Sequence, residues 1–205
     1  MINYPNRKVV TTLPKQSTNE QKSPNIKKSR LGVNFEDMIN DSNAYYLRKD
    51  LAVIHKKPTP IQITKVDYPK RSSAKITEAF YKVPSTTDYN GIYKGKYIDF
   101  EAKSCNGKSF TFNNLYHHQI EHLKLVEKHG GISFLLIRYN DFEEVYIVPT
   151  KMLYEKYQES FNGGRKSLAY SFVKENAYLV PTGYAPMVDY LQIIDNLYFK
   201  ENKDV

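Results

Sequence analysis

The chain has 205 residues, of which 40% are hydrophobic and 25% are charged, and it carries a net charge of +8. This length allows one domain with a hydrophobic core, and the composition excludes a wholly disordered chain. No apolar run reaches the roughly 20 residues that span a bilayer, and the single cysteine excludes an intrachain disulfide and a cysteine zinc cluster.

The positive charge is concentrated in two segments. Residues 1–34 hold seven Lys and Arg against one Glu, and residues 55–82 hold seven against one Asp and one Glu. Such clustering favours nucleic acid as a partner, because Lys and Arg gain by displacing counterions from phosphate. An anionic membrane surface and an acidic protein are the alternatives. The polar, basic N-terminus lacks the apolar core of a signal peptide, so we expect a cytoplasmic protein that does not enter a membrane.

The first half of the chain predicts an arm, a helix and several strands. Residues 1–29 are polar, contain proline and show no apolar period, which predicts a flexible basic arm before a folded domain at 30–205. The remaining patterns predict, in chain order, a helix at 31–47, a short buried strand at 51–55, an edge strand or turn region at 61–68 and a basic hairpin or arm at 69–82.

The second half predicts the centre of a sheet. Two strands are expected at 86–93 and 96–103, and the turn signals Asn90-Gly91 and Lys94-Gly95 favour an antiparallel hairpin. Further patterns predict a helix at 114–129, strands at 132–139 and 144–148, a helix at 150–159 and an amphipathic stretch at 187–199. This order predicts an α/β fold in which helices flank a mixed central sheet.

The strand at 97–103 has two different faces. Side chains alternate along a strand, so Ile98, Phe100 and Ala102 can enter a core. The opposite face carries three charged side chains, those of Asp99, Glu101 and Lys103. A half-exposed strand with a cross-strand ion pair would give the same pattern.

The preceding strand favours a catalytic interpretation. Asp88 shares a face with Thr86 and can lie close to Glu101 and Lys103. Two adjacent carboxylates repel each other unless a cation joins them, and oxygen ligands of this kind suit Mg²⁺. A neighbouring lysine can stabilise the extra charge of a phosphate transition state or orient the attacking water. We therefore predict a metal-dependent nuclease site at Asp88, Glu101 and Lys103.

Other side chains have two interpretations each. Gln119 falls on the apolar arc of its predicted helix, so it either bonds to backbone or reaches the metal site. Glu36 is either a solvated acid or a further support for the cluster. The histidines at 117, 118, 122 and 129 lack Cys or carboxylate partners at zinc spacing, and Cys105 has no identified base.

Longer strings carry a family resemblance. They are AVIHKKPTPIQI (52–63), DYPKRS (67–72), STTDYNGIYKGKYIDFEAK (85–103) and HHQIEHL (117–123), with NYPN near the start and GYAP near the end. These strings resemble the RecU family, the Holliday junction resolvases of low-GC Gram-positive bacteria. The Asp88…Glu101-x-Lys103 pattern also resembles the signature of restriction-endonuclease-like nucleases. The sequence departs from the family pattern at 28–33 and at 104–107.

The resemblance implies a restriction-endonuclease-like fold with a basic stalk near 57–82. It implies a homodimer that cuts opposing strands of a four-way junction with Mg²⁺, Mn²⁺ being possible, and that also anneals strands and modulates the RecA recombinase. The implied metal positions are Thr86, Asp88, Glu101 and Gln119, with Lys103 at the transition state. DNA contacts are expected from Arg30, Lys56, Lys57, Lys70, Arg71 and Lys75. A duplex repair nuclease and a strand-annealing accessory protein are the alternatives.

Overall fold

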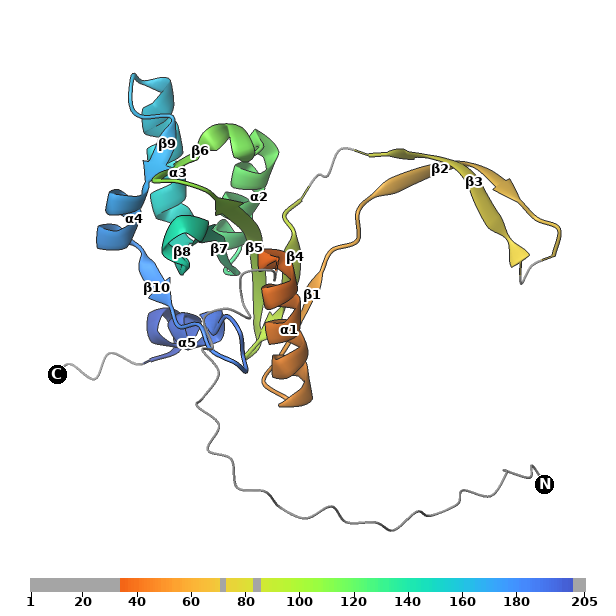
Figure 1. Ribbon diagram of the computed structural model, residues 1–205, viewed down its shortest axis with the longest axis horizontal. Helices are drawn as coiled ribbons and strands as arrows, with labels where there is room; N and C mark the ends of the chain where they lie inside the picture. Colours follow the sequence, from red (N-terminus) through yellow and green to blue (C-terminus); the bar gives the residue numbers. More distant parts are fainter. Residues whose placement is uncertain (1–33, 71–72, 83–85, 201–205) are drawn as a thin grey trace, which may run out of the picture. The chain divides into compact units, whose positions relative to one another are not determined.

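A computed structural model describes residues 34–70, 73–82 and 86–200, and its centre is a six-stranded sheet (Figure 1). The strand order is β1-β4-β5-β7-β8-β10. The only parallel neighbours in this sheet are β5 and β7, and the other neighbours are antiparallel. The strands are β1 (Ala52–Lys56), β4 (Tyr89–Tyr93), β5 (Lys96–Cys105), β7 (Ile132–Tyr139), β8 (Glu144–Pro149) and β10 (Tyr178–Val180).

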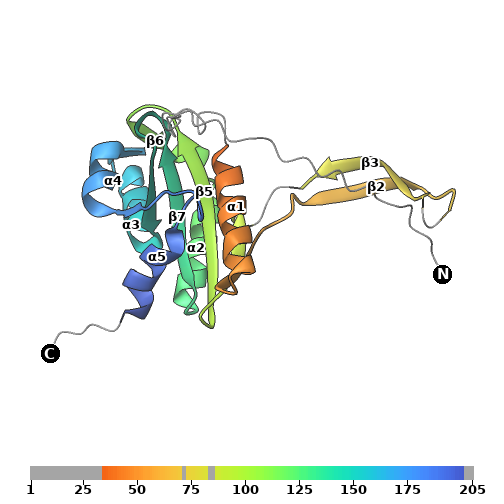
Figure 2. The same cartoon turned by 60° about the horizontal axis from the view of Figure 1, so that its bottom comes forward.

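Helices cover both faces of this sheet and create two hydrophobic cores (Figure 2). The first core contains side chains of α1 (Phe35–Arg48) and α5 (Tyr190–Ile194), which η4 (Asp195–Phe199) continues. The second core contains side chains of α2 (His117–Lys128), α3 (Thr150–Phe161) and α4 (Tyr170–Asn176). The predicted mixed central sheet flanked by helices is therefore confirmed.

The two cores lie on opposite faces of the sheet, and the alternation of side chains along β5 decides which face its charged residues occupy. The Phe100 ring enters the first core and stacks between Tyr89 and Phe134, with centroid distances of 4.9 and 4.8 Å. Asp99 and Glu101 point to the other face, where both are fully buried. The interpretation of β5 as a half-exposed strand is wrong, because side chains of α2 cover this face.

The β2–β3 hairpin is separate from the six-stranded sheet. Strands β2 (Ile61–Asp67) and β3 (Lys75–Tyr81) pair with each other, and their residues are exposed apart from the half-buried Val66. Their register shifts between Ile63 and Val66. The predicted strand at 61–68 thus pairs outside the central sheet. The hairpin lies in the segment where a basic stalk is expected, and the stalk itself stays a prediction.

Some boundaries and short elements differ from the predictions. Helix α1 begins at Phe35, where the side chain of Asn34 accepts a hydrogen bond from the Glu36 amide. Helix α2 begins at His117 because Phe112–Asn114 forms the 3-10 helix η2. The sequence did not predict α4, β10 or the small sheet of β6 (Ser109–Thr111) and β9 (Ser167–Ala169). The arm at 1–29 lies outside the described residues, and within the described part no helix is long and apolar enough to cross a membrane.

Candidate active site

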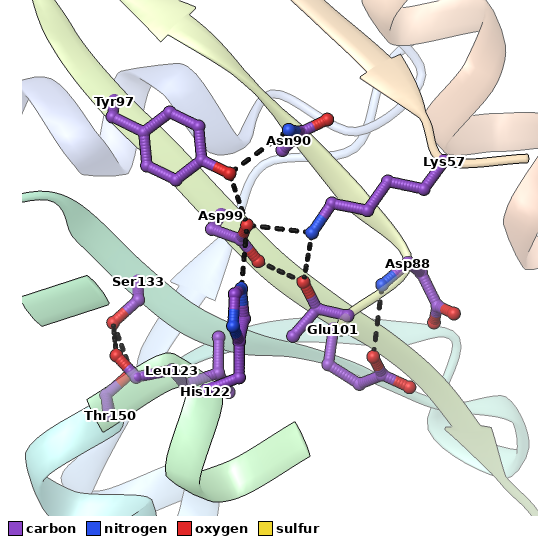
Figure 3. Close-up of polar contacts among 11 residues, drawn as sticks. Lys57, Asp88, Asn90, Tyr97, Asp99, Glu101, His122, Leu123, Ser133 and Thr150 are labelled. Carbon is purple, nitrogen blue, oxygen red and sulfur yellow. Dashed lines mark hydrogen bonds and ion pairs between the residues drawn. The ribbon is translucent and has the colours of Figure 1, made fainter. Parts of the chain in front are cut away.

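The site is centred on Glu101 in β5 (Figure 3). Its Oε2 accepts a hydrogen bond from the Asp88 backbone N–H at 3.1 Å, and its Oε1 accepts one from Gln119 Nε2 at 2.7 Å. Lys103 Nζ lies 2.5 Å from the same Oε1 and 3.9 Å from Asp88 Oδ2. Asp88 Oδ2 also accepts a hydrogen bond from the Ala102 N–H at 3.2 Å. The structure thus brings Asp88, Glu101, Lys103 and Gln119 together.

A tight hairpin explains why Asp88 meets Glu101. Lys94 and Gly95 have φ values of 47° and 75°, which is the pattern of a two-residue turn that matches strand twist. This turn sets the register in which Tyr89 pairs with Phe100. Asp88 and Glu101 are the next residues beyond this pair on the two strands, so they lie beside each other. Of the two turn signals in the sequence, Lys94-Gly95 is confirmed and Asn90-Gly91 is wrong.

Gly91 lies inside β4 for a reason other than a turn. A Cβ at this position would lie 2.0 Å from the Val53 carbonyl oxygen, so β1 approaches too closely for a side chain. The glycine is needed for strand packing beside the site.

Burial and a neighbouring charge alter the ionisation of Glu101. Burial raises the pKa of Glu101 to about 7, and the nearby Asp88 carboxylate acts in the same direction, while Lys103 opposes both. A carboxyl group with this pKa is partly protonated at neutral pH in the absence of a cation. A cation between Asp88 and Glu101 would favour the ionised form of both groups.

The oxygen atoms at this site fit Mg²⁺ or Mn²⁺. Across residues 34–70, 73–82 and 86–200, no group of three or more His, Cys, Asp or Glu side chains could hold a metal ion. An ion here would therefore combine the two carboxylates of Asp88 and Glu101 with neutral oxygens and water. Mg²⁺ is commonly held in this way, since it retains several waters and uses one or two carboxylates.

Two cavities open the site to solvent and share Glu36 and Asp88. One has a volume of about 330 Å³ and is also lined by Lys103. The other has a volume of about 240 Å³ and is also lined by Thr86 and Lys56. Glu36 forms an ion pair with Lys56 and is about 40% exposed. Glu36 and Thr86 therefore lie beside the predicted cluster, at its solvent side.

Gln119 contacts both a backbone amide and a residue of the candidate site. Its Oε1 accepts a hydrogen bond from the Tyr116 backbone N–H at 3.0 Å, near the start of α2. Its Nε2 donates to Glu101. In this arrangement Gln119 orients Glu101, and the amide would have to turn for its oxygen to bind a metal ion.

The residues predicted to contact DNA lie in different environments. Lys57 Nζ lies 2.8 Å from the buried Asp99 and its side chain is only 18% exposed, and its contact with DNA stays a prediction. Lys56 is half-exposed, and Lys70 and Lys75 are exposed at the hairpin. The remaining two, Arg30 and Arg71, lie outside the described residues.

Sequence reasoning missed a second polar cluster around Asp99. Asp99 Oδ2 lies 2.7 Å from the Tyr97 hydroxyl and 3.2 Å from His122 Nε2, and Thr87 donates to Oδ1. Burial alone would raise the pKa of Asp99, but hydrogen bonds from Lys57, Thr87 and Tyr97 outweigh burial and lower that pKa. The sequence contained a signal for this cluster. Residues 119 and 122 share one face of α2, and residues 99 and 101 share one face of β5, so the two pairs can meet.

Comparison with known proteins gives a family match over most of the chain. The family described as "RecU: Recombination protein U" matches residues 30–196. Proteins named "Holliday junction resolvase RecU" from Bacillus mycoides (strain KBAB4) and Bacillus cereus (strain G9842) are each 46% identical to this chain. Each alignment covers 97% of this chain and 98% of the relative. A structure of Hjc, a Holliday junction resolvase from Archaeoglobus fulgidus, is 10% identical and aligns with a TM-score of 0.43 over 70% of this chain and 94% of Hjc.

Proposed function

Because the chain belongs to the RecU family, we propose that it is a Holliday junction resolvase that cuts opposing strands of a four-way DNA junction by metal-dependent hydrolysis. The observation that best supports this activity is the buried Glu101 beside Asp88, with the Lys103 ammonium in contact with it. A binding protein gains nothing from carboxylates clustered near phosphate. The same residues suit a nuclease.

Each residue has a proposed part in the reaction. A Mg²⁺ or Mn²⁺ ion bound here would supply positive charge and help to activate the water that attacks the phosphate. Asp88 and Glu101 would hold the ion, with Thr86 as a further candidate ligand, and Gln119 would keep the Glu101 carboxylate oriented. Lys103 places a fixed positive charge where negative charge develops on the phosphate.

The proposal extends to assembly and DNA contacts. Two symmetric cuts need two sites related by a two-fold axis, so we infer a homodimer. The β2–β3 hairpin would be the stalk, with Lys70, Arg71 and Lys75 contacting phosphate and positioning the DNA without reading its sequence. Strand annealing and modulation of RecA are further activities that the family resemblance implies.

Substrate choice tests the proposed function directly. Wild-type protein is incubated in Mg²⁺ with a labelled movable four-way junction and with a linear duplex of the same sequence. We expect paired nicks on opposing strands of the junction that DNA ligase can seal, and slower cutting of the duplex. Equal cutting of both DNAs would favour a duplex repair nuclease. Junction binding and annealing without any cleavage would favour an accessory protein.

Metal affinity is expected to depend on pH through Glu101. A metal ion binds the ionised carboxylate, so a proton on Glu101 competes with the ion. Since the pKa of Glu101 is about 7 without metal, Mn²⁺ affinity should fall about tenfold between pH 8 and pH 6 and stay nearly level above pH 8. Free Mn²⁺ can be followed by electron paramagnetic resonance. Glu101→Gln should bind weakly with little pH dependence, and a pH-independent wild-type affinity would contradict the assignment.

A further inference from the structure

Asp99 is the centre of a buried network one step along β5 from the site. It lies two residues before Glu101 on the same face, and its side chain is fully buried. The side chains of Lys57, Tyr97 and His122 contact its carboxylate (Figure 3). The Thr87 hydroxyl donates a further hydrogen bond to it.

Two of these contacts tie the segment that carries Asp88 to β5. Thr87 directly precedes Asp88 and is almost fully buried while it donates to Asp99. Lys57 directly follows β1, and its backbone N–H donates to the Asp88 carbonyl oxygen at 2.8 Å. The Lys57 ammonium then donates to both Thr87 Oγ1, at 3.0 Å, and Asp99 Oδ2, at 2.8 Å.

The same contacts lie where the hairpin joins the sheet. The hairpin leaves β1 next to Lys57 and returns to β4 through the segment that contains Thr87. Asp99 therefore contacts one residue in each of the two segments that connect the hairpin to the sheet.

Helix α2 supports the two carboxylates of β5 in parallel. Gln119 donates to Glu101, and His122, one turn later, contacts Asp99. Each of the two carboxylates therefore has a partner on α2. Only Glu101 also contacts Lys103 and the Asp88 backbone.

We propose that Asp99 is a positioning residue for the metal site, acting through Thr87 and Lys57 to hold the Asp88 carboxylate at the distance from Glu101 that a divalent ion requires. This inference rests on the proposed function, because it assumes that Asp88 and Glu101 share an ion. In this role Asp99 would act through its neighbours, without contacting the reacting phosphate or the ion. Outer partners of this kind typically change metal affinity 10- to 100-fold when removed.

A purely structural role makes a different prediction. If Asp99 only neutralises the buried Lys57 ammonium, removal of both charges should leave the melting temperature and the Mn²⁺ affinity at wild-type values, since apolar replacements of buried ion pairs are often neutral. If Asp99 positions Thr87 and Asp88, the same double variant should fold normally and still bind metal weakly.

The experiment measures Mn²⁺ affinity by electron paramagnetic resonance at pH 8 in the full-length protein, with melting temperature in EDTA as the fold control. Lys57→Met/Asp99→Leu removes both charges and the oxygen that accepts the Thr87 hydrogen bond, and it should melt near wild type and bind Mn²⁺ about 10- to 100-fold more weakly. Thr87→Val removes only the hydroxyl at constant volume and should also weaken binding. Thr87→Ser retains the hydroxyl and should stay within about twofold of wild type, a smaller change than any lost partner contact causes.

Each outcome decides the inference. Wild-type affinity in both the double variant and Thr87→Val would overturn it, and so would equal losses in Thr87→Ser and Thr87→Val. If the double variant does not fold, the two Thr87 variants decide the matter. Asp88→Ala separates this failure from that of the proposed function. Loss of Mn²⁺ binding in Asp88→Ala alone would reject only the role of Asp99, whereas unchanged binding in Asp88→Ala would reject the metal site itself.

Discussion

Replacement of Asp88 by alanine is expected to lower the rate of junction cleavage in Mg²⁺ by about a thousandfold or more, while junction binding in EDTA stays at least as tight. Asp88 supplies one of the two carboxylates at the site, and its loss would remove one of the two proposed oxygen ligands. A catalytic metal ion contributes several kcal/mol to the transition state, and each 1.36 kcal/mol corresponds to a tenfold change in rate. We expect binding not to depend on the ion, because Lys and Arg contacts to phosphate generally supply most of the affinity for DNA.

The rate should be measured in a single turnover on preformed protein–junction complexes. Glu155→Ala is a matched control, because Glu155 is an exposed acid on α3. That variant should cut at the wild-type rate. Undiminished cleavage by Asp88→Ala would remove Asp88 from the site and with it the proposed chemistry.

The predictable part of the site follows from local periodicity. Alternation along β5 placed Glu101 and Lys103 on one face, and helix phase placed Gln119 on the buried side of α2. Both patterns depend on residues close in sequence, so a single chain is enough to find them. The contact between Gln119 and Glu101 shows that the two local patterns meet.

The remaining features depend on which distant segments meet. Lys57 was considered only as a DNA contact, and no local pattern showed that its ammonium would pair with the buried Asp99, 42 residues later. Local alternation cannot show that α2 covers β5, and without that knowledge a charged face is read as exposed. Strands of three residues such as β6, β9 and β10 carry too little pattern to be recognised, because tertiary pairing defines them.

Replacement of Lys103 by methionine is expected to reduce cleavage by about 100- to 1,000-fold at saturating Mn²⁺, the range seen when one group that stabilises transition-state charge is removed. Methionine retains much of the apolar length of lysine and removes the ammonium. Mn²⁺ affinity should stay the same or increase, because the ammonium that now lies 2.5 Å from Glu101 competes with a metal ion for the same carboxylate.

This response is opposite to that of Asp88→Ala, and the contrast separates the two roles. A ligand variant loses affinity for the ion, so excess Mn²⁺ should partly restore its rate if Glu101 still binds. A Lys103 variant retains the ion and lacks charge stabilisation, so excess Mn²⁺ should not restore its rate. Lys156→Met, at an exposed ion pair on α3, is the control for a lost surface charge and should cut normally. If Lys103→Met loses Mn²⁺ affinity together with rate, Lys103 maintains the geometry of Asp88 and Glu101, and the charge that stabilises the phosphate must come from another residue.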